Sequence, residues 1–84
     1  MKYSVYVLRS VASGRYYIGS TDDVPARVTH HNSERARWTK RFQPWELVHS
    51  EVYRTRGEAV QRERQLKALK GIGRHLDAIM RGEF

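Results

Sequence analysis

The fold is decided by residues 3–19, whose sequence is YSVYVLRSVASGRYYIG. Two short apolar runs, at 3–8 and 16–18, flank a turn of small residues at 10–14, which is typical of a β-hairpin. Each expected strand carries a central tyrosine, Tyr6 in the first and Tyr17 in the second. Whether these two tyrosines share a functional site depends on the residues that the rest of the chain places beside them.

Whether the two phenol rings meet depends on the register of the hairpin, because a slip of one residue sends a side chain to the other face. Direct pairing of Tyr6 with Tyr17 leaves a loop of even length, either residues 11–12 or residues 10–13, and both lengths are ordinary. A purely structural role is also open, since tyrosines are common in strands and pack well there.

The chain has 84 residues, of which 39% are apolar and 30% charged, and this balance predicts one small globular domain over residues 1–84. It contains no cysteine, which excludes disulfides, thiolate metal sites and a cysteine nucleophile. We expect a cytoplasmic protein, because the sequence has neither an apolar signal segment nor an apolar run long enough to cross a membrane.

The chain is strongly basic, with 16 Lys and Arg against 9 Asp and Glu and a formal net charge of +7. On so small a surface this charge attracts polyanions, and nucleic acid is the expected partner. An anionic membrane is a weaker alternative, because the basic residues do not lie opposite one broad apolar helix face.

A short helix is expected near residues 23–31. Thr21 or Asp22 can cap its first amides, Pro25 is tolerated in a first turn, and Asn32 is a good terminator. The helix should pack on the sheet beside the hairpin.

Arg27 and His31 stand one turn apart on this helix, at the margin of the face that should meet the sheet. Taken singly, they are well explained as a solvated arginine and a hydrogen-bonded histidine. Their position near the two tyrosines makes them candidates for a shared site.

Residues 33–44 show no clear period and predict an extended basic loop. The segment mixes cations with aromatic residues, which suits it to neutralise phosphates and to stack on sugars or bases. It can equally be a surface loop that its aromatic residues fix to the core. The candidate nucleic-acid-binding residues are Arg35, Arg37, Trp38, Lys40 and Arg41, together with Lys67 further along the chain.

The second half of the chain predicts one strand followed by two helices. Residues 45–53 read as a half-buried strand, Thr55 caps a long helix over 56–70 that Gly71 closes, and a last helix is expected over 74–80. The resulting order β-β-α-β-α-α predicts an α/β fold with a small, three-stranded antiparallel sheet flanked by helices.

The long helix carries a carboxylate, Glu63, inside its apolar stripe, between Ala59 and Val60 in projection. One explanation is a salt bridge to Lys67, four residues on. The other is that Glu63 is a metal ligand.

Other kinds of site are poorly supported. The histidines lack paired metal-ligand spacing, the Gly-Ile-Gly at 71–73 does not lie between a strand and a helix, and no nucleophile elbow surrounds a serine. The residues that remain are Tyr6, Tyr17, Arg27, His31 and Glu63.

In order and spacing, these residues resemble the GIY-YIG nuclease superfamily, and in particular its small stand-alone bacterial members. Ser-Val-Tyr at 4–6 stands for the first half-motif and Tyr-Ile-Gly at 17–19 for the second. The resemblance covers nearly the whole chain. The sequence departs from the pattern at Ser4, where the family has glycine, and no asparagine at 76–80 matches the one that larger members carry.

The resemblance implies hydrolysis of DNA phosphodiester bonds with the help of one divalent ion, Mg²⁺ or Mn²⁺. By position it makes Tyr6 and Tyr17 the two motif tyrosines, Arg27 the family arginine and Glu63 the metal-binding glutamate. His31 is a further catalytic candidate.

Such a reaction needs positive charge to offset the charge that develops on the phosphate, and a base to take a proton from water. Arg27 would supply one positive charge and a metal ion at Glu63 another. The ordinary pKa of a tyrosine is about 10, so Tyr6 could act as the base only if nearby positive charge lowered its pKa. Tyr17 and His31 would orient Tyr6 or share the proton, and the identity of the base stays open.

The leading hypothesis is therefore a metal-dependent DNA endonuclease of slight sequence specificity, acting on damaged, branched or single-stranded DNA in repair or recombination. Two alternatives stay open. The chain could be a non-catalytic DNA- or RNA-binding module, or a nuclease subunit that a protein partner activates.

Overall fold

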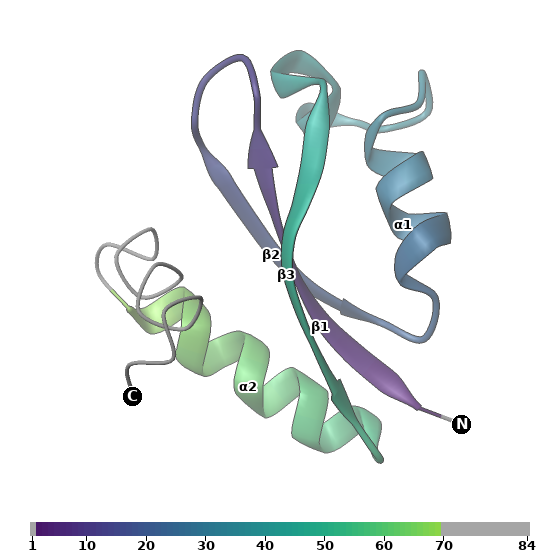
Figure 1. Ribbon diagram of the computed structural model, residues 1–84, viewed down its shortest axis with the longest axis vertical. Coiled ribbons are helices and arrows are strands. Elements are labelled where there is room, and N and C mark those ends of the chain that lie inside the picture. Colours follow the sequence, from purple (N-terminus) through teal and green to yellow (C-terminus); the bar gives the residue numbers. More distant parts are fainter. Residues whose placement is uncertain (1, 70–84) are drawn as a thin grey trace.

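The computed structural model of this chain describes residues 2–69 and shows a three-stranded sheet with two α-helices (Figure 1). The strands are antiparallel and lie in the order β2-β1-β3. Along the chain the elements are β1 (Tyr3–Ser10), β2 (Tyr16–Thr21), α1 (Val24–His31), a 3-10 helix (Trp38–Phe42), β3 (Trp45–Tyr53) and α2 (Arg56–Ala68). The expected α/β class and the order β-β-α-β-α are confirmed. The last helix expected over 74–80 lies outside the described residues, as does Gly71.

The hairpin has a different register from the direct tyrosine pairing considered above. Tyr6 lies opposite Gly19 and Leu8 lies opposite Tyr17. The reason is the loop, which closes through a bond from the Ser10 amide to the Arg15 carbonyl (2.8 Å), so that residues 11–14 form the turn. Because the register moves by two residues, Tyr6 and Tyr17 still point to the same face of the sheet.

Alternate residues of β1 build two apolar layers, one on each face of the sheet. The layer that joins the sheet to α2 has as its fully buried members Val5, Val7, Ala59 and Leu66. The layer that faces α1 has as its buried members Tyr6, Leu8 and Trp45. The two helices therefore cover opposite faces of the sheet (Figure 1). Tyr6 belongs to the layer that faces α1, whereas Glu63 lies on α2.

The start of α1 is capped by Asp23, whose carboxylate accepts a hydrogen bond from the backbone N–H of Ala26 (3.1 Å). The caps expected at Thr21 or Asp22 are wrong by one or two residues. The Thr21 hydroxyl instead accepts a hydrogen bond from the backbone N–H of Asp23 (3.1 Å), and so orders the turn that leads into the cap.

The end of α1 lies at Asn32, as expected, and this residue also fixes the helix to the sheet. Its side-chain amide donates to the carbonyl of Trp45 (2.9 Å) and accepts from the N–H of the same residue (2.7 Å). The end of α1, where His31 lies, is thus held against the first residue of β3.

The segment between α1 and β3 is not the extended loop that its sequence predicts, but Phe42 packs on the core, as the alternative interpretation expects. It contains the 3-10 helix, and it buries Ala36 and Thr39 to within 5% exposure. Gln43 donates to the carbonyls of His31 (3.0 Å) and Ser33 (2.8 Å), and the Trp45 indole donates to the carbonyl of Thr39 (2.8 Å). The apolar and amide side chains inside the basic segment therefore hold it against the end of α1.

Helix α2 begins where expected, because the Thr55 hydroxyl accepts a hydrogen bond from the backbone N–H of Glu58 (3.2 Å). It ends at Ala68, two residues before the expected end. Within residues 2–69, neither helix has the length and apolar character that a membrane span requires.

A half-buried carboxylate, Glu51, connects β3 to α2. It accepts hydrogen bonds from the Tyr53 hydroxyl (2.6 Å) and from Nε of Arg62 (2.8 Å), and it pairs with Nε2 of His49 (2.8 Å). Burial alone would raise the pKa of Glu51, but the hydrogen bonds from Arg62, His49 and Tyr53 outweigh it and hold this pKa at about 2. Since Arg62 precedes Glu63 on α2, the network also fixes the rotation of the helix that presents Glu63.

We expect this network to make stability depend on acid pH. The pKa of Glu51 is depressed in the folded state, so its contribution is complete above the ordinary value of 4.5 and is lost as the pH falls towards about 2. Above pH 4.5 the Glu51→Gln variant should be less stable than the wild type, on the order of 2 kcal/mol. Urea unfolding of both proteins should show this difference shrinking with acid, and a difference that stays constant would contradict the assignment.

Candidate functional site

Tyr6, Tyr17 and His31 form one aromatic cluster between the sheet and the end of α1. The Tyr6 hydroxyl lies 3.2 Å from Nε2 of His31. The ring centroids of Tyr6 and Tyr17 are 6.2 Å apart, and those of Tyr17 and His31 are 4.5 Å apart. The structure thus brings together three of the four residues predicted to be catalytic.

The absence of a side chain at Gly19 leaves the space that the Tyr6 ring occupies. A Cβ atom added at Gly19 would lie 2.6 Å from the Tyr6 hydroxyl oxygen and 2.8 Å from Cζ, closer than side chains tolerate. The phenol therefore lies against the bare backbone of β2, an edge strand of the sheet. This close approach is a physical reason for the glycine of the second half-motif.

We expect Gly19→Ala to destabilise the protein by about 1–3 kcal/mol, because the buried Tyr6 ring has to move. The matched control is Gly57→Ala, since the nearest atom to an added Cβ at Gly57 is the Thr55 hydroxyl oxygen, 4.0 Å away. That change should be neutral or stabilising by up to about 1 kcal/mol. Urea unfolding measures both, and equal stabilities of the two variants would refute the packing argument.

His31 is buried, with 5% of its surface exposed, and has a partner for each ring nitrogen. Its Nδ1 lies 3.2 Å from the Thr39 hydroxyl, and its Nε2 faces Tyr6. Burial, and next the charges of His30 and Arg27, lower the pKa of His31 below its ordinary value of 6.5. The imidazole is therefore neutral near neutral pH.

The pKa of Tyr6 moves against the direction that a tyrosine base requires. Burial, and next the neighbouring Tyr17, raise this pKa well above its ordinary value, and the positive charge of Arg27 offsets only part of the rise. Tyr6 is thus a neutral phenol in this structure. Tyr6 could act as the base by itself only if positive charge lowered its pKa, and in the structure this pKa is raised instead.

Arg27 is exposed on α1, one turn before His31. Its charge acts on both Tyr6 and His31, which places its guanidinium within electrostatic reach of the aromatic cluster. Among residues 2–69 no carboxylate lies within ion-pair distance of it. Arg27 is therefore available to an anion at the mouth of the cluster.

Glu63 lies on α2, on the other face of the sheet, and its charge acts on Tyr6. Its side chain is 20% exposed and accepts a hydrogen bond from Nζ of Lys67 (2.7 Å), so the ion pair considered from the sequence is present. Burial would raise the pKa of Glu63, but hydrogen bonds from Lys67 and Ser20 outweigh it and lower the pKa below its ordinary value.

Ser20 and Gly19, adjacent on β2, lie beside Glu63 and Tyr6 respectively. Ser20 hydrogen-bonds Glu63, and the preceding residue, Gly19, lies against the Tyr6 hydroxyl. The charge of Glu63 correspondingly raises the pKa of Tyr6. The candidate site therefore wraps around the edge of β2, with the aromatic cluster on one side and the carboxylate on the other.

The donor atoms at Glu63 suit a hard divalent cation. The residue offers an ionised carboxylate beside the Ser20 hydroxyl, and Mg²⁺ prefers such oxygen ligands. Within residues 2–69 no three His, Cys, Asp or Glu side chains are grouped to hold a metal ion. An ion bound at Glu63 would keep most of its water ligands, as Mg²⁺ sites often do.

The predicted nucleic-acid-binding residues lie in different environments. Arg35 and Arg37 line a hollow of about 250 Å³ together with Arg27, His31 and Tyr17. The others are engaged within the protein: Lys40 pairs with Glu34 (2.6 Å), Lys67 pairs with Glu63, and the Arg41 guanidinium lies 5.8 Å from the centre of the Phe42 ring. The side chain of Trp38 lies outside the described part of the structure.

Sequence reasoning missed Thr39 as the second partner of His31. It lies eight residues after His31, in a segment without a regular period, so no local pattern indicates the contact. It also missed Arg56, which stands at the first position of α2 and lines a second hollow together with Arg27.

A family model described as the GIY-YIG catalytic domain matches residues 2–75. A UPF0213 protein of Staphylococcus epidermidis is 42% identical over 67 residues, which cover 79% of this chain and 80% of the relative. A UPF0213 protein of Staphylococcus aureus is 41% identical over 64 residues, covering 75% of this chain and 77% of the relative.

One solved structure extends this similarity to the fold. The solution NMR structure of a UPF0213 protein from Bacillus halodurans covers 98% of this chain, which in turn covers 87% of that protein. The two share 29% sequence identity and superpose with a TM-score of 0.58.

Proposed function

This chain belongs to the GIY-YIG family, and we propose that it is a metal-dependent endonuclease that hydrolyses DNA phosphodiester bonds. The catalytic domain that defines the family indicates a nuclease-type activity on nucleic acid. The observation that supports the proposal best is the hydrogen-bonded pair of Tyr6 and His31, with the charges of Arg27 and Glu63 both acting on Tyr6.

In the proposed mechanism, the neutral His31 is the final proton acceptor. We assign its proton to Nδ1, which donates to the Thr39 hydroxyl and leaves Nε2 to accept from Tyr6. As water attacks the phosphorus atom, the Tyr6 oxygen takes a proton from the water while its own proton passes to His31. The pair in this way avoids a free tyrosinate, which burial disfavours.

Arg27 would bind a non-bridging oxygen of the attacked phosphate and offset the charge that develops there. Tyr17, whose ring contacts both Tyr6 and His31, would hold them in line. A divalent ion bound at Glu63, Mg²⁺ or Mn²⁺, would supply the second positive charge at the phosphate. The leaving oxygen, when its bond to phosphorus breaks, would take a proton from solvent.

We further propose slight sequence specificity, because the arginines at the site are suited to contact phosphates, and such contacts carry no direct information about the bases. Single-stranded, branched or damaged DNA are the substrates that fit this proposal, and repair or recombination the processes. Affinity should fall steeply with salt, since Arg27, Arg35 and Arg37 would displace counterions from the phosphates.

The proposal is tested by incubating the purified protein with end-labelled single-stranded, duplex, flapped and four-way branched DNA, with and without Mg²⁺ or Mn²⁺. We expect cleavage of at least one substrate that requires the metal. Binding without metal-dependent products would favour a non-catalytic DNA- or RNA-binding module. Products that form only after a bacterial extract is added would favour a partner-activated subunit.

A further inference from the structure

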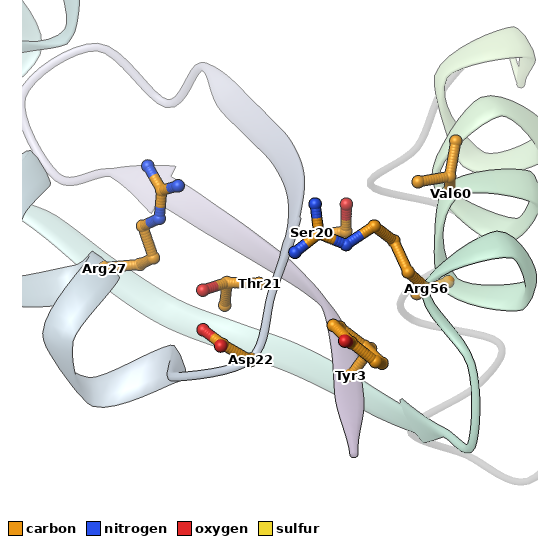
Figure 2. Close-up of a pocket in the computed structure, with 8 residues that line it drawn as sticks. Tyr3, Ser20, Thr21, Asp22, Arg27, Arg56 and Val60 are labelled. Carbon is orange, nitrogen blue, oxygen red and sulfur yellow. The ribbon is translucent and has the colours of Figure 1, made fainter. Parts of the chain in front are cut away.

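A hollow of about 160 Å³ lies over the end of β2, between the first turns of α1 and α2. Figure 2 shows Arg27 on its α1 side and Arg56 on its α2 side, with Thr21 and Asp22 between them. The hollow therefore brings together two arginines that stand 29 positions apart in the sequence.

The charges around this hollow favour an anion. Among residues 2–69 no carboxylate is paired with either Arg27 or Arg56. The Arg56 guanidinium instead lies over the ring of Tyr3, 5.3 Å from its centre, which holds it at the rim. The lining also includes the hydroxyl of Thr21, which donates to the Asp23 carbonyl (3.5 Å), and one exposed carboxylate, that of Asp22.

This hollow is beside the reacting groups and does not contain them. Tyr6, Tyr17 and His31 are absent from its lining, and the last two line the hollow on the other side of Arg27. Ser20 connects it to the site, because it lines the hollow and hydrogen-bonds Glu63. An anion held here would lie next to the phosphate that is attacked.

We infer that this hollow binds the phosphate next to the one that is cleaved, and that Arg56 is the residue that holds it. The inference rests on the proposed function. Arg27 would then lie between two consecutive phosphates of one DNA strand, the one that is cleaved and the one that Arg56 holds. The inference also specifies the substrate: a strand that continues past the cleaved bond with a singly charged diester, since Asp22 repels the doubly charged phosphate of a strand end.

The test compares Arg56→Gln with the matched control Arg54→Gln, which makes the same change of charge at an exposed residue outside the hollow. Cleavage of the best DNA substrate by the full chain should fall roughly tenfold in kcat/KM for Arg56→Gln, the effect of losing one charged hydrogen bond, and little for Arg54→Gln. In the absence of metal, the dependence of log affinity on log salt should become shallower by about 0.9 for Arg56→Gln only.

The phosphate itself is identified with substrates that carry a neutral methylphosphonate on one side or the other of the cleaved bond. With the methylphosphonate at one of these two positions, the wild type should lose activity. On that same substrate Arg56→Gln should be no less active than the wild type. An Arg56→Gln penalty that persists at both positions would overturn the inference. Equal penalties for Arg56→Gln and Arg54→Gln would do the same.

The failure of this inference is distinct from the failure of the proposed function. A wild type that cleaves none of the substrates refutes the proposed function, whereas a wild type that cleaves while Arg56→Gln cleaves equally well refutes the role of Arg56 alone. Circular dichroism and thermal unfolding establish that each variant is folded. If Arg56→Gln does not fold, Arg56→Lys should keep the sensitivity to the methylphosphonate, and loss of that sensitivity in a folded Arg56→Lys protein would also overturn the inference.

Discussion

Replacing Glu63 by Gln is expected to abolish metal-dependent cleavage, with a loss of about a hundredfold or more and with the fold retained. The expected size follows from the metal, since Lewis-acid stabilisation of a phosphoryl transition state contributes several kcal/mol. Glutamine keeps the length of the side chain but loses the negative charge that a hard cation requires. The rate should be measured over a wide range of Mg²⁺ concentration.

The fold should survive this change because the ion pair that is lost is partly exposed. The Lys67 side chain is 55% exposed, and pairs of this kind one turn apart on a helix contribute about 0.3–0.5 kcal/mol. The matched control is Glu46→Gln, which removes an exposed carboxylate that lies 3.7 Å from Arg9 on the sheet. It should cleave as the wild type does. Wild-type cleavage by Glu63→Gln at low Mg²⁺ would exclude Glu63 as the metal ligand.

Those parts of the fold that depend on neighbouring residues could be predicted from the sequence. The strand over 45–53 and the helix start at Arg56 lie where the proline, the apolar alternation and the Thr55 cap put them. The expected cap, Thr21 or Asp22, lies one or two residues before the observed cap at Asp23. The Thr21 hydroxyl instead accepts a hydrogen bond from the Asp23 N–H, in the turn before the helix begins. Such a choice among adjacent polar residues depends on turn geometry, and composition does not encode that geometry.

The members of the candidate site could also be predicted, but their arrangement could not. The motif identified Tyr6 and Tyr17, whereas the position of the Tyr6 hydroxyl depends on the space left by Gly19 at an edge strand. The same limit applies to Thr39. Its contact with His31 exists because amide and indole hydrogen bonds fold the basic segment back on α1. Tertiary packing of this kind leaves no periodic signal in a single sequence.

The second large effect is expected at His31. If the neutral imidazole receives the proton of Tyr6, His31→Gln should lower the cleavage rate by about a hundredfold or more, as loss of a general base does. The pH profile is the diagnostic measurement. Because the pKa of His31 lies below its ordinary value of 6.5, the wild-type rate should stay level as the pH falls through neutrality, and decrease only below that value.

In His31→Gln this acid limb should disappear, because the amide does not titrate in this range. A purely structural role for His31 predicts a different result, namely a lower rate with the same acid limb. Since His31 is buried, Thr39→Val serves as the milder variant. It removes the partner of Nδ1 and should cause a smaller loss of rate, with the acid limb retained. An unchanged rate and acid limb in folded His31→Gln would assign the base to another group, and the Tyr6–His31 pair would then only position the phenol.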